Sequence, residues 1–450
     1  MTRRFRATGT LRPHDPNQDI EWSSGSGAWL WDNAGNRFLD CVSGYSANVL
    51  GHCHPDLVAA LTDQASKLIF ATGGESSLRR EFEQQLCHVV SRSAAHHSQE
   101  SSSFGSPKAW ISTTGARAIE IAWRIAFHRS PGGLATFDLG YHGRSIATSY
   151  VSDTAQQDCL MVGSSPVLRF PIPFPRVEAG SNKTLQDACN ESLTVFRELL
   201  RTNSGRLSAL LVEPAIGSRG YYFAPNEYIQ RLVELGREHG LLIISDEVQM
   251  GLGRLGSMVA SHSQGWYPDL LVLGKALGGG ILPISCVIGS SEIMDQLRTG
   301  YESETFAGAP LACRIAIEVL RILDSTDVIE ASSSLHAELR SVLASKLPRD
   351  AVSGVGSATV IDLRTTMRHL SNTLARAEDS FVAETGTKAT YRYAGLLREN
   401  GILVHVTGSS RDRIAIIPPL SIRQEEMNRV GVECVTAWQK IAQEATSGML

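Results

Sequence analysis

The sequence predicts an α/β fold in which a largely parallel β-sheet carries helices on both faces and is joined to a smaller lobe. Between residues 109 and 288, short apolar runs alternate with amphipathic helical stretches, the pattern of strand–helix–strand units. From about residue 316 the pattern changes to helices, a few short strands and a closing helix, which indicates a separate C-terminal lobe. A chain of 450 residues is long enough for two or three domains.

The N-terminal part of the chain is expected to form a lobe of its own. Apolar runs flank turn-forming residues at 32–36, which predicts a β-hairpin over residues 28–40. Residues 55–68 carry apolar side chains at helical spacing. The Ser-rich stretch 91–107 is predicted to be an exposed loop or a mobile insertion.

The sheet is predicted from six apolar runs, each too short for a helix. One helix between them has clear ends, because Pro225 suits a first turn and Gly240 suits a stop. The expected strands are residues 109–112, 134–137, 209–212, 241–245, 270–273 and 284–288.

Composition excludes several classes of partner. With 42 Lys and Arg against 46 Asp and Glu, the chain has no broad positive field for nucleic acid or anionic membrane. Eight cysteines are scattered without a C-x-x-C pair, so we expect reduced thiols and no metal site. His96 and His97 leave a metal role open, but a solvated loop is the favoured interpretation. No apolar run reaches the roughly 18 residues of a membrane span, and no signal peptide is recognisable. We therefore expect a cytoplasmic protein that acts on small molecules.

Two polar residues emerge at the carboxyl ends of predicted strands, the edge at which open α/β sheets bind ligands. Asp246 follows the run 241–245, and Lys275 follows the run 270–273. Either alone is explained by helix capping or a surface charge. Together they match pyridoxal 5'-phosphate (PLP) chemistry, in which a lysine forms a Schiff base and a carboxylate keeps the pyridine nitrogen protonated.

A phosphate site is expected where the run 109–112 leads into a helix. Gly115 and Ala116 lie at that helix start, so free N–H groups and the positive helix end face the same spot. An ordinary capped helix would look the same. Tyr141, after the next strand, could stack on a cofactor ring or simply pack in the core.

These residues lie in stretches that resemble the class III aminotransferases of PLP fold type I. The stretches are Val212-Glu213-Pro214, residues 246–256 and residues 268–280, with further similarity from Gly35 to Leu420. Within the class, the resemblance is greatest to the ornithine aminotransferases. It implies a seven-stranded, mostly parallel sheet in a large domain at 71–315, and a small α+β domain formed by both chain ends, residues 1–70 and 316–450.

The resemblance also implies a role for each matching residue. Lys275 would carry the Schiff base, Asp246 would pair with the pyridine nitrogen, and Thr305 would bind the phosphate of the second subunit, which implies a homodimer. Tyr45 and Arg144 would hold the two ends of the substrate and leave its distal amine to react. The further cofactor contacts implied are Gly115, Ala116, Tyr141, Val248 and Gln249.

The chain departs from the pattern at the positions that serve the amino acceptor. A glutamate and an arginine that act as a switch in the family correspond here to Ser218 and Ala415, and Arg413 or Arg219 are the candidate substitutes. The glutamate that normally follows the phosphate turn is replaced by Arg117.

The leading interpretation of the function is transamination between an amine donor and a keto acid or aldehyde acceptor. Two alternatives remain open at this point. One is a PLP-dependent lyase, decarboxylase or racemase on the same scaffold, because the same activated cofactor can serve each reaction. The other is a PLP-fold protein recruited for binding or regulation.

Overall fold

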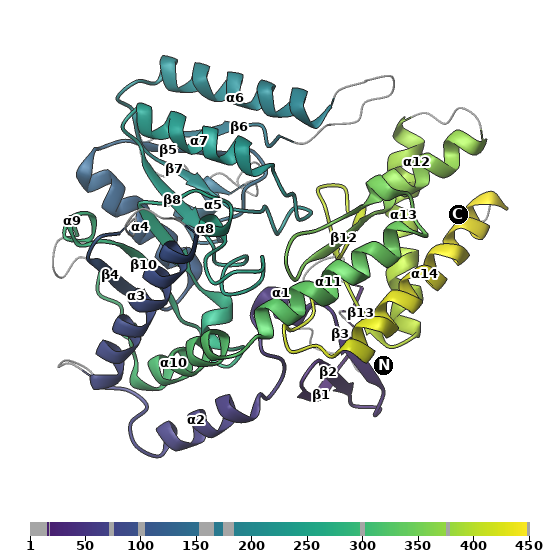
Figure 1. The fold of residues 1–450 in the computed structure, drawn as a ribbon, viewed down its shortest axis with the longest axis horizontal. Coiled ribbons are helices and arrows are strands. Elements are labelled where there is room, and N and C mark those ends of the chain that lie inside the picture. The colour runs from purple at the N-terminus through teal and green to yellow at the C-terminus, as the bar shows by residue number, and fades with distance from the viewer. Residues whose placement is uncertain are drawn as a thin grey trace, which may run out of the picture.

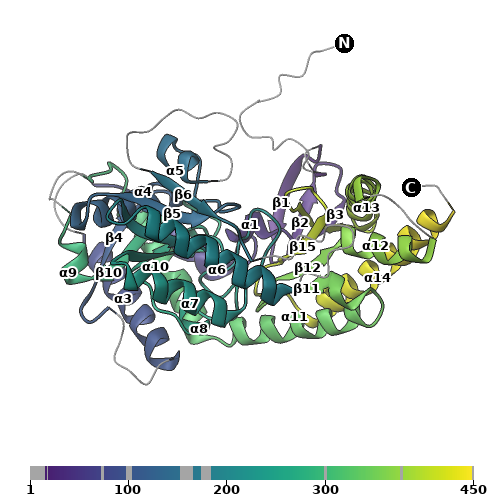
Figure 2. The ribbon, with the colours of Figure 1, turned by 90° about the horizontal axis from the view of Figure 1, so that it is seen from above.

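A computed structural model of the chain describes residues 16–17, 19–71, 76–97, 104–152, 166–173, 184–297, 302–374 and 379–447. A large lobe around a seven-stranded sheet lies beside a smaller lobe that contains two four-stranded sheets (Figures 1 and 2). The predicted α/β fold is confirmed.

The seven-stranded sheet has the order β4-β10-β9-β8-β7-β5-β6, and only β10 runs antiparallel to its neighbours. All six predicted strands are present. The seventh, β6, was missed because it is a four-residue edge strand whose apolar run is interrupted by Arg169. The strands are β4 (Pro107–Ser112), β5 (Gly133–Phe137), β6 (Val167–Phe170), β7 (Leu207–Val212), β8 (Leu242–Asp246), β9 (Leu270–Leu273) and β10 (Ser285–Ser290).

Helices cover both faces of this sheet because successive strand residues point to opposite sides. Leu211 and Ile244 pack with α4 (Gly115–Arg129). Their neighbours Leu210 and Ile243 pack with helices of the other face. Those helices are α6 (Leu185–Thr202) and α7 (Asn226–Glu238), the latter beginning one residue after the predicted start, Pro225, which is its N-cap.

The prediction of a loop at 91–107 is wrong over its first part. Helix α3 (Ser77–His97) continues through the serines and histidines, and residues 98–103 lie outside the described residues. Val90 and Ala94 are buried on the inner face of α3, so packing overrides the weak helix propensity of the Ser-rich sequence. Helix α3 packs with α10 (Pro310–Ser325), which also contacts α2 (Pro55–Ala65), the helix expected at 55–68.

The small lobe joins the two ends of the chain. The predicted hairpin is present, and its second strand pairs in parallel with β13 near the C-terminus. The first small sheet consists of β1 (Trp22–Ser26), β2 (Trp29–Asp32), β3 (Arg37–Asp40) and β13 (Ile402–Leu403). The second consists of β11 (Val352–Ser353), β12 (Thr359–Asp362), β15 (Arg413–Ile416) and β14 (His405–Thr407).

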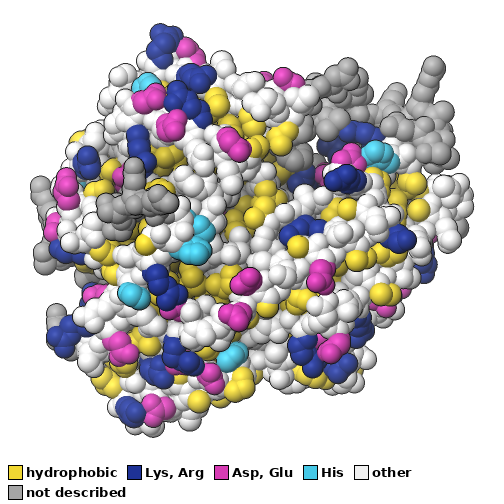
Figure 3. Space-filling model, viewed as in Figure 1, with side chains coloured by type: hydrophobic (Ala, Val, Ile, Leu, Met, Phe, Trp, Pro, Cys, Tyr) yellow, Lys and Arg dark blue, Asp and Glu magenta, His cyan; other side chains and the backbone are white. Residues whose placement is uncertain are grey.

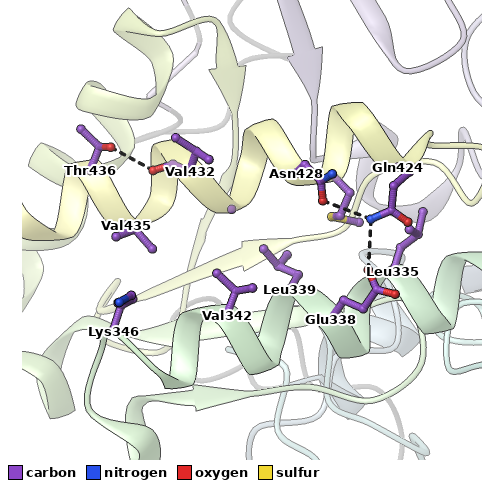
Figure 4. Close-up of a pocket in the computed structure, with 12 residues that line it drawn as sticks. Leu335, Glu338, Leu339, Val342, Lys346, Gln424, Asn428, Val432, Val435 and Thr436 are labelled. Carbon is purple, nitrogen blue, oxygen red and sulfur yellow. Dashed lines mark hydrogen bonds between the residues drawn. The ribbon is translucent and has the colours of Figure 1, made fainter.

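The helices of the small lobe are α11 (Val328–Ala344), α12 (Leu363–Leu374), α13 (Asp379–Glu399) and α14 (Gln424–Thr446). Between α11 and α14 lies a groove of about 410 Å³ (Figure 4). Leu339 and Val435 line it, and Gln424 bridges to Glu338 at 3.0 Å. The groove is lined by α11 and α14, which lie in the small lobe, apart from β8 of the large sheet (Figure 1).

Candidate active site

Asp246 and Lys275 emerge at the same edge of the large sheet. Asp246 ends β8, and Lys275 begins the short 3₁₀ turn η2 (Lys275–Gly278) directly after β9. Because β8 and β9 pair in parallel, their carboxyl ends lie side by side. Lys275 has a φ of 38°, a left-handed conformation that costs a non-glycine residue about 1–3 kcal/mol and is typical of functional sites.

The Asp246 carboxylate is held from both oxygens. His142 Nδ1 lies 2.7 Å from Oδ2, and the backbone N–H of Val248 donates to Oδ1 at 3.1 Å. His142 is buried, and its Nε2 lies 3.1 Å from Thr136 Oγ1 on β5. This fixed carboxylate can face a protonated ring nitrogen. The sequence reasoning missed His142, whose only signal was its place beside Tyr141 after a strand.

A second buried carboxylate, Glu213, follows β7. Its Oε1 accepts a hydrogen bond of 2.8 Å from the backbone N–H of Tyr141, so it fixes the turn that carries that ring. Burial, the largest cause, and the charge of Asp246 together raise the pKa of Glu213 to about 7, against the lowering effects of His142, the Tyr141 N–H and Lys275. Glu213 is therefore close enough to sense the charges of the site.

Three segments meet at the start of α4. Thr114 caps this helix by accepting from Arg117 N–H at 3.2 Å. A Cβ added to Gly115 would lie 2.7 Å from Val248 Cγ1, and one added to Gly143 would lie 2.6 Å from Ala116 Cβ. The glycines thus allow Val248 and the Tyr141 turn to close on a helix N-terminus, which is suited to binding phosphate.

The residues present fit PLP. Lys275 supplies an amine, Asp246 an anchored carboxylate, and the Gly115–Ala116 turn an anion site whose close approaches a Cβ would block. Gln249 lies in the turn after β8, and its Nε2 donates to the buried hydroxyl of Tyr221 at 3.0 Å. The structure therefore gathers the predicted cofactor residues of the large lobe at one edge of its sheet.

Tyr45 lies in a strained turn. Ser43, Tyr45 and Ser46 have φ values of 43°, 58° and 74° in the left-handed region, which L-residues rarely adopt. The buried Arg254 holds this turn by donating to Ser43 Oγ at 3.2 Å. The Tyr45 ring meets the His405 ring of β14 edge to face, with centroids 4.9 Å apart.

Tyr45 and Gln249 lie at the two ends of a row of side chains. The centroid of the His405 ring also lies 6.1 Å from that of Tyr221, whose hydroxyl accepts the hydrogen bond from Gln249. The row therefore runs from the N-terminal turn through the small lobe to the large lobe.

Arg144 is exposed, and its guanidinium lies 5.9 Å from the centroid of the Tyr141 ring. Ser145, the next residue, caps the short helix α5 (Ile146–Val151). This places a cation at the rim of the site, one residue beyond Gly143, where an added Cβ would clash with Ala116.

The two small-lobe positions linked to the amino acceptor by the resemblance, Ala415 and Arg413, do not present a free charged group. Ala415 is fully buried in an apolar cluster that includes Tyr221. Arg413, a candidate substitute for the missing arginine, donates to Asp362 Oδ2 at 2.9 Å and to the Gly220 carbonyl at 3.1 Å. The guanidinium of Arg413 is therefore already bonded to Asp362 of the small lobe and to the backbone at Gly220.

Thr305 lies on an exposed turn that follows Glu304. The Glu304 carboxylate reaches the phosphate turn of its own chain, accepting from Ser112 Oγ at 2.6 Å and from Thr113 N–H at 3.1 Å. Sequence reasoning did not single out Glu304.

The described residues bear on three expectations from composition, concerning metal sites, membrane spans and surface charge. No group of three His, Cys, Asp or Glu side chains in the described segments could hold a metal ion. Within the same segments, no helix is long and apolar enough to cross a membrane. Figure 3 shows side chains of both charges intermixed over the face in view.

Comparisons with known proteins agree with this geometry. The family model described as "Aminotransferase class-III" matches residues 12–436. Ornithine aminotransferase 2 of Staphylococcus aureus is 30% identical over 90% of this chain and 91% of its own. The solved structure of ornithine aminotransferase from Toxoplasma gondii superposes with a TM-score of 0.78 at 25% identity, covering 98% of this chain and 94% of that one.

A second solved structure, acetylornithine aminotransferase from Elizabethkingia anophelis, gives a TM-score of 0.71 at 26% identity, covering 97% of this chain and 96% of that one. The similarity thus extends over both lobes. The chain belongs to the class III aminotransferases and is a PLP-dependent aminotransferase.

Proposed function

We propose that this aminotransferase moves the distal (omega) amine of an ornithine-like amino acid to a keto acid or aldehyde acceptor. The observation that carries the proposal is the placement of Arg144, an exposed cation at the rim of the site beside Tyr141. An arginine fork binds a carboxylate through two parallel bonds and so fixes which end of the substrate points inward. The relatives named ornithine aminotransferase support the same donor.

Each residue of the site has a chemical task in this proposal. PLP supplies an electron-accepting ring that makes a hydrogen on the amine-bearing carbon acidic. Lys275 would hold the cofactor through its amine, and the same amine, when free, would remove and return that proton as general base and acid. Asp246, oriented by His142, would keep the ring nitrogen protonated.

The remaining contacts would position the ring and its phosphate. Tyr141 and Val248 would pack on opposite faces of the ring, and Gln249 would bind near the phenolic oxygen. Gly115 and Ala116 would bind the phosphate through the N-terminus of α4. Tyr45 would hold the α-amino end of the donor, opposite the carboxylate bound by Arg144.

The proposed amino acceptor is a keto acid or an aldehyde. Ala415 offers no charge to a second carboxylate, and Arg413 is paired with Asp362. A keto acid or aldehyde that needs no arginine at position 415 fits these residues.

The test is a half-reaction panel with purified PLP-loaded protein. Ornithine, lysine, 4-aminobutyrate, putrescine and alanine are each added while pyridoxamine phosphate and the carbonyl product are measured. We expect carboxylated donors with a distal amine to react fastest and ornithine to yield the aldehyde of its distal carbon. Faster reaction of alanine, or an amine product with PLP regenerated, would contradict the proposal.

We also propose that the protein is cytoplasmic and forms a homodimer with shared active sites. Each chain would comprise a large domain at 71–315 and a small domain formed by residues 1–70 and 316–450. Exposed apolar side chains surround the Thr305 turn, since Phe306 is 61% and Ile69 55% exposed. Phe306 packs on Phe70 with ring centroids 4.8 Å apart. Such a patch is suited to burial against a second copy, where Thr305 would reach the partner's phosphate. Light scattering that shows an active PLP-loaded monomer would contradict the dimer.

A further inference from the structure

We propose that Arg117 is a positioning residue that holds the segment bearing Thr305 against the phosphate-binding turn. This inference rests on the proposed function, in which Thr305 completes the phosphate site of a second subunit. It gives a task to a residue that the sequence marked only as a departure from the family pattern.

Arg117 lies in the first turn of α4 and reaches two glutamates that precede Thr305. Its Nη2 donates to Glu302 Oε2 at 2.5 Å, and its Nε lies 3.6 Å from Glu304 Oε1. The Glu302 side chain is 0% exposed, and Arg124, about two helical turns further along α4, brings its Nε within 2.6 Å of Oε1. A buried carboxylate between two guanidinium groups is costly to unpair, so it fixes the segment firmly.

Glu304 fastens the other side of the segment. Its carboxylate accepts from Ser112 Oγ at 2.6 Å, from Thr113 N–H at 3.1 Å and from Thr113 Oγ1 at 2.7 Å. These partners directly precede the Thr114–Gly115 turn. The segment is thus joined to the phosphate turn at two points, and the next residue, Thr305, projects outward.

The charges explain why an arginine is required at this position. Glu302 and Glu304 place two negative groups beside a turn that must bind an anion, and like charges repel at such distances. Arg117 lies between them and the helix start and offsets part of that charge. Without it, the carboxylates would oppose phosphate binding, and Glu302 would keep Arg124 but lose the partner that joins it to the first turn of α4.

The same arginine reaches the turn that carries Arg144. Its Nη1 donates to Glu120 Oε2 at 3.2 Å, and Glu120 Oε1 accepts from Ser145 Oγ. Ser145 caps α5 immediately after Arg144. Arg117 therefore links the phosphate-binding segment to the donor-binding turn.

The experiment titrates the apoprotein with PLP and, separately, with pyridoxal, which lacks the phosphate. Arg117→Gln should raise the Kd for PLP at least about tenfold, which is roughly 1.4 kcal/mol, and leave the Kd for pyridoxal nearly unchanged. Arg117→Lys should recover part of the loss, because it keeps the charge but not the fork. Thr305→Val should weaken PLP binding likewise, and combining it with Arg117→Gln should add little.

Arg231→Gln is the matched control, because Arg231 makes exposed ion pairs on α7 with Glu234 and Glu238. It should change neither Kd. If Arg117→Gln fails to fold, Glu302→Asp keeps the negative charge but shortens the reach to Arg117 and Arg124, so it loosens the same pairing and should give the same selective loss. Equal losses for PLP and pyridoxal, or full additivity with Thr305→Val, would overturn the inference. Failure of the proposed function would instead appear in the amine panel while this selective loss persisted.

Discussion

The edge of the large sheet that carries Asp246 and Lys275, called here the cofactor edge, and the turns proposed to face the substrate are built differently. Asp246 and Lys275 follow parallel strands whose residues are buried, and Asp246 is bound through both oxygens. Tyr45 instead lies in a left-handed turn, and Arg144 is exposed. In the proposed assignment, cofactor chemistry therefore depends on the ends of buried sheet strands, whereas donor and acceptor choice would depend on turns and small-lobe strands that can change without disturbing that edge.

The largest expected effect lies at the cofactor edge. Lys275→Ala should abolish covalent attachment of PLP and lower kcat at least about a thousandfold, because only this amine can form the bond and carry the proton. Borohydride treatment followed by mass spectrometry locates the reduced lysine adduct. Lys67→Ala, an exposed lysine paired with Asp63, is the control. A reducible lysine adduct that survives in Lys275→Ala would refute the assignment.

A smaller effect on attachment is expected from Asp246→Ala. The lysine bond can still form, but PLP affinity should fall more than about tenfold and turnover should fall further, because the ring nitrogen loses its partner. The absorbance spectrum of the lysine-bound cofactor and a PLP titration measure the two separately. If Asp246→Ala retained normal turnover, the carboxylate would be structural and His142 would only hold it in place.

Much of the cofactor edge could be predicted from the sequence, because the carboxyl ends of parallel strands lie at the same edge of a sheet. An apolar run such as 241–245 fixes the direction of its strand, and parallel pairing then brings Asp246 to Lys275. Contacts between side chains distant in the sequence were not predictable in this way. His142 meets Asp246 across 104 positions, and Glu304 meets Ser112 across 192.

The substrate side was harder to predict for physical reasons. The φ of 58° at Tyr45 is held by tertiary contacts of its turn, and nothing in local propensity announces it. Arg413 looked like a substitute for the missing arginine because strand alternation places it on the same face as Ala415. Its pairing with Asp362, on a neighbouring strand, was set by the sheet register.

A substrate-selective effect is expected from Arg144→Lys. Loss of one charge-assisted hydrogen bond, worth ~1.5–3 kcal/mol, should lower kcat/KM for carboxylated donors by about ten- to a hundredfold. Simple amines of equal length should be affected little, and the cofactor spectrum should stay unchanged. Arg201→Lys, on the exposed face of α6, is the control. Equal losses for both donor types would instead show that Arg144 merely supports its turn.

The smallest effect, on the pH dependence of stability, is expected for Glu213, which accepts from the Tyr141 N–H and senses the charge of Asp246. Because burial raises the pKa of this carboxyl from 4.5 to about 7, the folded protein holds a proton that the unfolded chain releases between those pH values. Its contribution to stability is therefore present below about pH 4.5 and is lost as the pH rises to about 7. Glu213→Gln, which stays neutral and keeps an acceptor for Tyr141 N–H, should remove this decline, on the order of 1–3 kcal/mol.

Urea unfolding of the holoenzyme at pH 5 and pH 7.5 measures the difference, with the exposed Glu234→Gln as control. The stability gap between Glu213→Gln and the unaltered protein should be larger at the higher pH, because only there is the glutamate charged while buried. A gap of the same size at both values would mean that Glu213 keeps its charge throughout. In that case His142 and Lys275 would outweigh the burial of this carboxylate, and the Tyr141 turn would be tied electrostatically to the cofactor edge.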